Sequence, residues 1–119
     1  NEGSVEVLQV RIFVDDSNKA PFDSWYESIR DKRVRLSIAS RILRVRQGNF
    51  GDHHGVGGGV FELRIHLGAG YRIYYGHHGG RLVIILGGGS KRGQQKDIEE
   101  AISLWERYRD EIERYSRDL

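Results

Sequence analysis

Hydrophobic residues recur along this chain with two different periods, and each period predicts its own type of element. Between residues 7 and 14, apolar side chains alternate with polar ones, which predicts a strand with one buried face. Residues 21–29 and 31–47 repeat their apolar positions every three or four residues, as helices with one buried stripe do. Pro21 suits the first turn of the first helix, and Asp31 can cap the second. The stripe of the second helix is formed by Val34, Ile38, Ile42 and Val45.

The middle and the end of the chain show the same two periods. Residues 48–59 are rich in glycine and histidine and are interpreted as a loop. Strands are then predicted at about 60–67, 71–76 and 81–87. The last of these is apolar on both faces, so we expect it in the interior of a sheet. A final helix is predicted from about Gln94 to Arg114.

The composition fits one domain. The chain has 119 residues, of which 38% are hydrophobic, enough for one core. The order of elements therefore predicts a single α+β domain across residues 1–119, with helices packed on a sheet. Because the chain has no cysteine, disulfides, cysteine-ligated zinc and thiol nucleophiles are excluded. No apolar run approaches the roughly 18 residues of a membrane span and no signal peptide is visible, so we expect a cytoplasmic protein with no membrane contact.

Charge is balanced in total but uneven along the chain. Lys and Arg number 19 and Asp and Glu 17, which argues against a simple polycation that coats nucleic acid. Residues 30–47 nevertheless hold seven basic groups and one acid, whereas residues 97–118 hold eight acids and four basic groups. The basic helix is either a solvated face or a surface that attracts RNA phosphates. On the second interpretation, its RNA-binding residues are Arg33, Arg35, Arg41 and Arg44.

The sequence FELRIHLGAGYRIYYG reads as a hairpin whose polar face is unusually cationic. A loop with an odd number of residues keeps the apolar side chains on one face, and a loop at 68–70 would pair His66 with Arg72 and Arg64 with Tyr74. Arg64 and Arg72 would then lie on a diagonal about 7–8 Å apart. Two such guanidinium groups repel each other unless an anion lies between them. Replacing Arg72 is therefore expected to leave the protein as stable, or slightly more stable.

Lys91 follows the next strand and should emerge at the same end of the sheet. We infer a catalytic pocket formed by Arg64, His66, Arg72 and Lys91, with Tyr74 beside it; the alternative is an ordinary solvated sheet face. Arginine forks match phosphate oxygens, and tyrosine offers a ring on which a base can stack. Cations without an acidic partner do not make a metal site, so we expect no metal or other cofactor. Two adjacent histidine pairs in glycine-rich loops are conceivable zinc ligands, but such neighbours are usually turn residues.

This pattern suits cleavage of an RNA phosphodiester. The 2′-hydroxyl attacks the adjacent phosphorus, and cationic groups stabilise the charge that develops on the phosphorane. A perturbed His, Lys or Tyr can move the protons.

Several segments together resemble the phage-derived, HigB-like branch of the RelE/ParE toxin superfamily, the killer proteins of type II toxin–antitoxin modules. The segments are NFGD (49–52), GVFELRI (59–65), GAGYRIYY (68–75), VIILGGGSK (83–91) and QQKDIEEAISLW (94–105). The resemblance covers roughly residues 20 to 110. It implies a bacterial or phage origin and a RelE-like fold, in which an N-terminal strand and two helices pack on a twisted antiparallel sheet that is followed by a C-terminal helix.

The same resemblance implies an activity and partners. RelE-like members are mRNA interferases, ribosome-dependent endoribonucleases that cut codons in the A site without a metal ion and arrest growth. The matching basic positions here are Arg64, Arg72 and Lys91. A cognate antitoxin, often a helix-turn-helix protein, is implied as a partner beside the ribosome and mRNA. Ser90 departs from the pattern, because the family usually has an acidic residue before the lysine.

Two alternatives remain open at this point. ParE-like relatives share the fold but poison DNA gyrase without cutting anything, and an inactive domain would only bind its antitoxin. The fold alone does not separate these activities.

Overall fold

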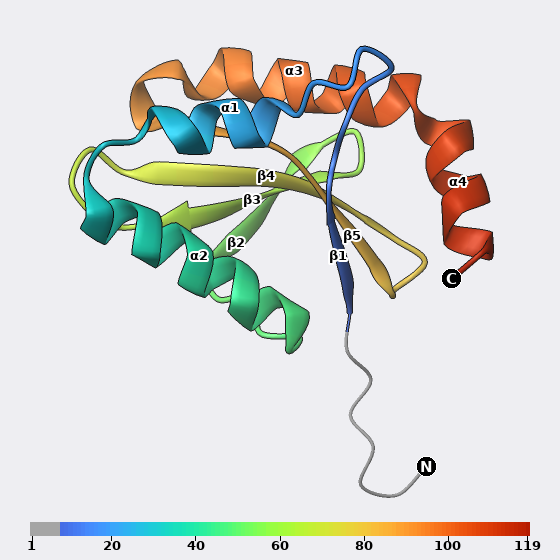
Figure 1. Cartoon of the computed structure of the whole chain (residues 1–119), viewed down its shortest axis with the longest axis horizontal. Coiled ribbons are helices and arrows are strands. Elements are labelled where there is room, and N and C mark those ends of the chain that lie inside the picture. Colours follow the sequence, from blue (N-terminus) through green and yellow to red (C-terminus); the bar gives the residue numbers. More distant parts are fainter. Residues whose placement is uncertain (1–7) are drawn as a thin grey trace, which may run out of the picture.

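The computed structural model describes residues 8–119. It shows a five-stranded mixed sheet with helices on both faces (Figure 1). Val7, the predicted start of the first strand, lies outside the described residues. The elements in chain order are β1 (Gln9–Ile12), α1 (Pro21–Ser28), α2 (Lys32–Arg46), β2 (His53–Gly57), β3 (Val60–Ile65), β4 (Tyr71–His78), β5 (Leu82–Ser90), a short 3₁₀ turn (Lys91–Gly93), α3 (Gln94–Arg107) and α4 (Arg109–Arg117). None of the helices within residues 8–119 is long and apolar enough to cross a membrane.

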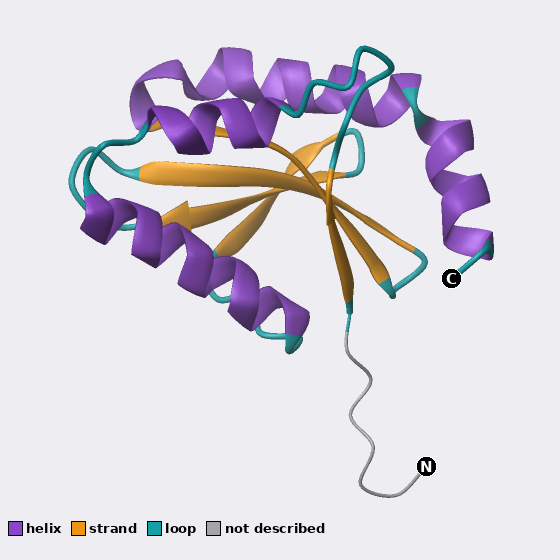
Figure 2. Ribbon diagram, in the orientation of Figure 1, coloured by secondary structure: helices purple, strands orange, loops and turns teal. Residues whose placement is uncertain are grey.

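Each face of the sheet is covered by its own hydrophobic cluster. Apolar residues of α1 and α2 pack on one face, and those of α3 and α4 pack on the other, so the sheet lies between two layers of helices (Figure 2). The predicted stripe of α2 is confirmed, because Val34, Ile38 and Val45 are buried and Ile42 packs against them. Asp31 caps α2 as predicted, since its side chain accepts a hydrogen bond from the backbone of Arg33. The α+β class is therefore confirmed.

The strand order is β1-β5-β4-β3-β2, and the pairs β5–β4, β4–β3 and β3–β2 are antiparallel. β1 runs parallel to β5, so the antiparallel arrangement that the resemblance implies holds for β2 to β5 and does not extend to the N-terminal strand. A parallel pair needs a long crossover, and here the whole chain between β1 and β5 supplies it. The interior position predicted for β5 is confirmed, because Leu82 to Leu86 are all buried.

An edge strand occupies part of the segment that the sequence predicts to be a loop. β2 pairs with β3, with His53 opposite Leu63, and the pairing is irregular between Gly55 and Gly57. Histidine and glycine give no strand signal, and most of β2 is exposed. The strand forms because the backbone of β3 offers it a partner, so its prediction as a loop is wrong.

The predicted C-terminal helix is broken in two at Tyr108. This residue has φ −102° and ψ 15°, and it separates α3 from α4. Its ring packs edge-on against Phe13 at a centroid distance of 4.8 Å, and its hydroxyl accepts a hydrogen bond of 3.4 Å from the backbone of Asp16. The bend lets the apolar side chain of Ile112 stay in the cluster on the sheet. A contact with a distant segment thus overrides a helical pattern that continues through the break.

The glycines at the end of β5 give the helices on both faces close access to the strand. Trp25 of α1 lies so close that a Cβ at Gly88 would overlap its indole ring, and a Cβ at Gly89 would overlap the carboxylate of Asp97 in α3. The glycines of the sequence GGGSK therefore allow close helix packing, in addition to connecting β5 to Lys91.

Gly88→Ala is expected to lower the free energy of unfolding by about 1–3 kcal/mol, the usual cost of overpacking. Gly87→Ala is the matched control, because a Cβ at Gly87 meets nothing within 4 Å. Urea denaturation of the two variants measures the difference. Equal losses for both would mean that the indole ring does not require a glycine beneath it.

Candidate functional site

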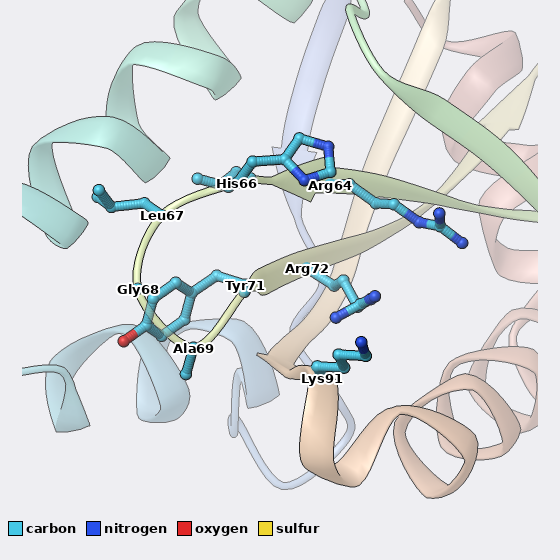
Figure 3. Close-up of a pocket in the computed structure, with 10 residues that line it drawn as sticks. Arg64, His66, Leu67, Gly68, Ala69, Tyr71, Arg72 and Lys91 are labelled. Atoms are coloured by element: carbon cyan, nitrogen blue, oxygen red, sulfur yellow. The ribbon is translucent and has the colours of Figure 1, made fainter.

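A pocket of about 440 Å³ lies at the end of the β3–β4 hairpin, beside the start of the 3₁₀ turn. Arg64 and His66 line it from the end of β3 and the loop after it, and Arg72 lines it from β4. Lys91 joins them from the first position of the 3₁₀ turn, directly after β5, and its backbone N–H donates a 3.0 Å hydrogen bond to the carbonyl of Gly70. Figure 3 shows the charged ends of Arg64, Arg72 and Lys91 directed to the same side of the pocket. The structure thus brings together these four predicted residues.

The two arginines face each other directly across the hairpin. Arg64 pairs with Arg72, and Glu62 pairs with Tyr74, so the predicted pairing of Arg64 with Tyr74 is wrong by two residues. The strands are joined by five residues, 66–70, instead of the predicted three. Because both loop lengths are odd, the prediction still places the correct side chains on each face.

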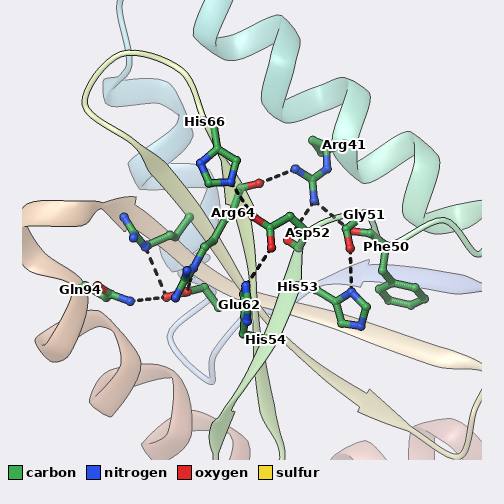
Figure 4. Close-up of polar contacts among 11 residues, drawn as sticks. Arg41, Phe50, Gly51, Asp52, His53, His54, Glu62, Arg64, His66 and Gln94 are labelled. Carbon is green, nitrogen blue, oxygen red and sulfur yellow. Dashed lines mark hydrogen bonds and ion pairs between the residues drawn. The ribbon is translucent and has the colours of Figure 1, made fainter.

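A buried carboxylate, that of Glu62, contacts both of these arginines. Figure 4 shows it beside Arg64 and Gln94. The Nε atom of Arg64 donates a 2.7 Å hydrogen bond to Oε1 of Glu62, and the Nε atom of Arg72 lies 3.5 Å from Oε2. The side-chain amide of Gln94 donates a 2.9 Å hydrogen bond to the same Oε2. The hydrogen bond to Glu62 raises the pKa of Arg64. The prediction of a pocket without an acidic partner is therefore wrong.

Sequence reasoning missed Glu62 because its position alternates with apolar residues, as a solvent-facing residue does. Its exposed fraction is 0%, since the start of α3 covers this part of the sheet. The signal that was available is the position itself: Glu62 is two residues before Arg64 and so shares its face.

His66 is held at the rim by a carboxylate from the loop before β2. Its Nε2 lies 2.5 Å from Oδ2 of Asp52, whose Oδ1 lies 2.8 Å from Nε2 of His54. Hydrogen bonding to His66 is the main cause that lowers the pKa of Asp52, and hydrogen bonding to His54 adds to it. If Nε2 of His66 carries the proton in this pair, Nδ1 of the neutral ring is a free acceptor. The geometry is that of an imidazole oriented by a carboxylate, as in general-base sites.

The lowered pKa of Asp52 predicts a pH dependence of stability. A carboxyl group whose pKa is lower in the folded state stabilises the fold above its unfolded pKa of about 4, and this contribution disappears as the pH falls through the folded pKa. Wild type should therefore exceed Asp52→Asn in free energy of unfolding at pH 5, and the difference should shrink as the pH is lowered below about 4. Urea denaturation across this range checks it. A difference that stays constant with pH would contradict the role of Asp52.

Tyr74 does not belong to the pocket. Its exposed fraction is 0%, and it lies in the hydrophobic cluster between the sheet and the C-terminal helices. Burial raises the pKa of its hydroxyl above the ordinary range. The prediction that Tyr74 stands beside the pocket and stacks on a nucleotide is wrong, because α3 covers this part of the polar face. Tyr71 lines the pocket instead and provides its aromatic surface.

Arg41 is a structural residue rather than part of an exposed basic face. It is buried, its Nη1 donates a 2.5 Å hydrogen bond to the carbonyl of Arg64, and its Nη2 donates one of 2.9 Å to that of Phe50 (Figure 4). The carbonyl of Asp52 accepts a third hydrogen bond of 3.4 Å. Burial is the main cause that lowers the pKa of this guanidinium. Arg41 thus joins α2 to the backbone on which both Arg64 and Asp52 stand.

The other predicted RNA-binding arginines of α2 lie outside the pocket. Arg33 and Arg44 are exposed, and Arg33 lies 3.8 Å from the carboxylate of Asp31. Arg35 lies over the ring of Tyr26 at 5.2 Å. None of these three arginines lines the pocket.

The fold and the pocket define this chain as an α+β domain with a cationic pocket at one end of a mixed sheet. The chain is 49% identical over 80 residues to an uncharacterized protein of Haemophilus influenzae, and the match covers 67% of this chain and 81% of that protein. The chain therefore belongs to the same family as the Haemophilus protein. No family model matches the chain, and no solved structure matches it.

Proposed function

We propose that this protein is a toxin of the RelE/ParE superfamily, of the HigB-like branch, that cleaves mRNA on the translating ribosome without a metal ion. The observation that carries the proposal is the convergence of Arg64, Arg72 and Lys91 on one pocket, with His66 at its rim. Two of these three cations, Arg64 and Arg72, share one buried carboxylate, Glu62, so the pocket keeps an excess of positive charge. A phosphodiester that gains negative charge during the reaction is the substrate that such a pocket stabilises.

The proposed reaction is an intramolecular displacement at phosphorus. The 2′-oxygen of the RNA attacks the adjacent phosphorus while its proton passes to a base, and His66 is the residue placed to accept it. The bond from phosphorus to the 5′-oxygen breaks, and that oxygen takes a proton from solvent water as it leaves, which gives a 2′,3′-cyclic phosphate and a 5′-hydroxyl end. Arg64, Arg72 and Lys91 stabilise the non-bridging oxygens of the phosphorane.

The partners follow from this activity and from the sequence resemblance. The arginines of α2 that lie outside the pocket, Arg33, Arg35 and Arg44, would contact ribosomal RNA phosphates with little sequence preference. Such an enzyme acts in the cytoplasm, where translating ribosomes lie, and is held inactive by a cognate antitoxin, for which a helix-turn-helix protein is the expected class.

Lys91→Ala is expected to slow cleavage of mRNA on purified translating ribosomes by about 10² to 10³, the usual effect of removing one charged contact from a preorganised site. Arg92→Ala is the matched control, because Arg92 is the neighbouring exposed cation of the same turn and does not line the pocket. Mapping of mRNA 5′ ends gives the rate at each codon.

Two outcomes would overturn the proposal. Intact mRNA together with gyrase-linked DNA breaks in expressing cells would identify a ParE-like poison. Equal cleavage by the wild type and Lys91→Ala would place the active site elsewhere.

A further inference from the structure

We propose that Glu62 is the positioning residue of this pocket, and that it orients Arg64 and Arg72 toward the RNA phosphate from beneath. This inference rests on the proposed function. Glu62 itself touches no substrate, because its exposed fraction is 0%.

Glu62 contacts the Nε atom of each arginine. Its carboxylate accepts a hydrogen bond from Nε of Arg64 at 2.7 Å and lies 3.5 Å from Nε of Arg72. Within residues 8–119, no Nη atom of either guanidinium takes part in a hydrogen bond. An arginine has five N–H donors, of which four are on the two Nη atoms. Glu62 thus accepts a hydrogen bond from the inner donor of Arg64 and forms an ion pair with the inner nitrogen of Arg72, which has no hydrogen-bond partner among the described residues. The outer donors of both side chains are left for a ligand.

The burial of the three side chains agrees with this arrangement. Exposed fractions are 0% for Glu62, 10% for the Arg72 side chain and 35% for that of Arg64. The carboxylate is therefore at the bottom, and the arginines lead from it to the surface. Their charged ends point to the side of the pocket where Lys91 also ends (Figure 3).

Gln94 fixes the carboxylate in turn. Its side-chain amide donates a 2.9 Å hydrogen bond to Oε2 of Glu62, the oxygen that faces Arg72. Gln94 is the first residue of α3, so the rotation of the carboxylate depends on where this helix begins. Each oxygen of Glu62 then has an assigned neighbour, which defines the plane of the carboxylate and hence the direction of both guanidinium groups.

If Glu62 served only to balance charge, its removal would have the opposite effect on cleavage from the one expected of a positioning residue. If Glu62 merely neutralised the arginines, its removal would make the pocket more positive, which should strengthen RNA binding and speed cleavage. If Glu62 orients the arginines, its removal should slow the chemical step while binding of RNA is kept, since a small displacement of a preorganised group is enough to cost about 10²-fold in rate.

Glu62→Gln separates the two roles, because it removes the charge at nearly constant size. We expect kcat for mRNA cleavage on translating ribosomes to fall about 10²-fold, while the Kd for a short RNA with methylated 2′-hydroxyls is unchanged or lower. Glu106→Gln, the same charge change at an exposed position of α3, is the control and should leave both quantities as in wild type. A Glu62→Gln protein that cleaves as fast as wild type, or faster, overturns the inference. So does one that loses binding and cleavage in proportion.

A spectroscopic readout tests the same contacts without activity. The Nε–H groups of Arg64 and Arg72 should give protected ¹H–¹⁵N signals in wild type, and titration with inorganic phosphate should shift them without displacing their partner. Should Glu62→Gln fail to fold, Gln94→Ala keeps the carboxylate and both arginines, and it should reduce the protection and kcat to a smaller extent. If the wild type cleaves no RNA, the proposed function fails; these signals then still decide whether Glu62 orients the arginines. Unprotected signals in folded wild type would overturn the inference.

Discussion

Replacing Arg72 with alanine is expected to slow the proposed RNA cleavage strongly and to destabilise the fold in the same variant. On the proposed function, the rate should fall by about 10² to 10³, because the proposed charged contact of Arg72 with the phosphorane is removed. The free energy of unfolding should fall by about 3 kcal/mol, the lower end of the range for breaking a buried ion pair, since Arg64 and Gln94 still contact Glu62. The sequence alone predicted unchanged or higher stability for this variant. Its premise, a repulsive pair with no anion, is wrong because Glu62 contacts both arginines.

The double variant Glu62→Gln/Arg72→Ala distinguishes the loss of stability from the loss of cleavage. Removing both members of a buried pair leaves no unpaired charge, so stability should recover relative to Arg72→Ala. Cleavage should stay lost, because the arginine is still absent. Thermal unfolding and cleavage on translating ribosomes measure the two quantities. An Arg72→Ala protein as stable as wild type would show that Arg72 is not needed to neutralise Glu62.

Arg41→Ala is expected to have the second large effect on stability. Its guanidinium donates to the carbonyls of Arg64, Phe50 and Asp52, and alanine leaves them without these donors. A hydrogen bond to a charged group contributes about 1.5–3 kcal/mol, so the loss should exceed about 3 kcal/mol in total.

Arg44→Ala is the control for this prediction. Arg44 lies one turn further along α2 and is exposed, so its replacement should change the free energy of unfolding by no more than about 0.5 kcal/mol. Guanidinium chloride denaturation compares the two variants. Similar small effects for both would show that Arg41 is not a structural residue and belongs to the exposed basic face that the sequence predicts.

The parts of the fold that depend on local pattern were predictable. The stripe of α2, its cap at Asp31 and the apolar run of β5 are all visible in short windows, and all are confirmed. Features set by distant contacts were not. β2 exists because β3 pairs with it, and α3 ends at Arg107 because Tyr108 packs against Phe13.

The site shows the same division between local and distant information. Alternation along the hairpin placed Arg64 and Arg72 on one face, and the chain path placed Lys91 beside them. What alternation does not reveal is which part of that face a helix covers. Residues 62 and 74 share the face of the arginines and lie deeper under α3, so one carries a buried carboxylate and the other a buried phenol.

The two glycines at the end of β5 restrict how this family can change over evolutionary time. Trp25 needs the absence of a side chain at Gly88, and Asp97 needs the same at Gly89. A side chain at position 88 costs stability unless bulk is lost at position 25, and one at position 89 requires the carboxylate of Asp97 to move. Each glycine should therefore be inherited together with the large or charged residue that it accommodates.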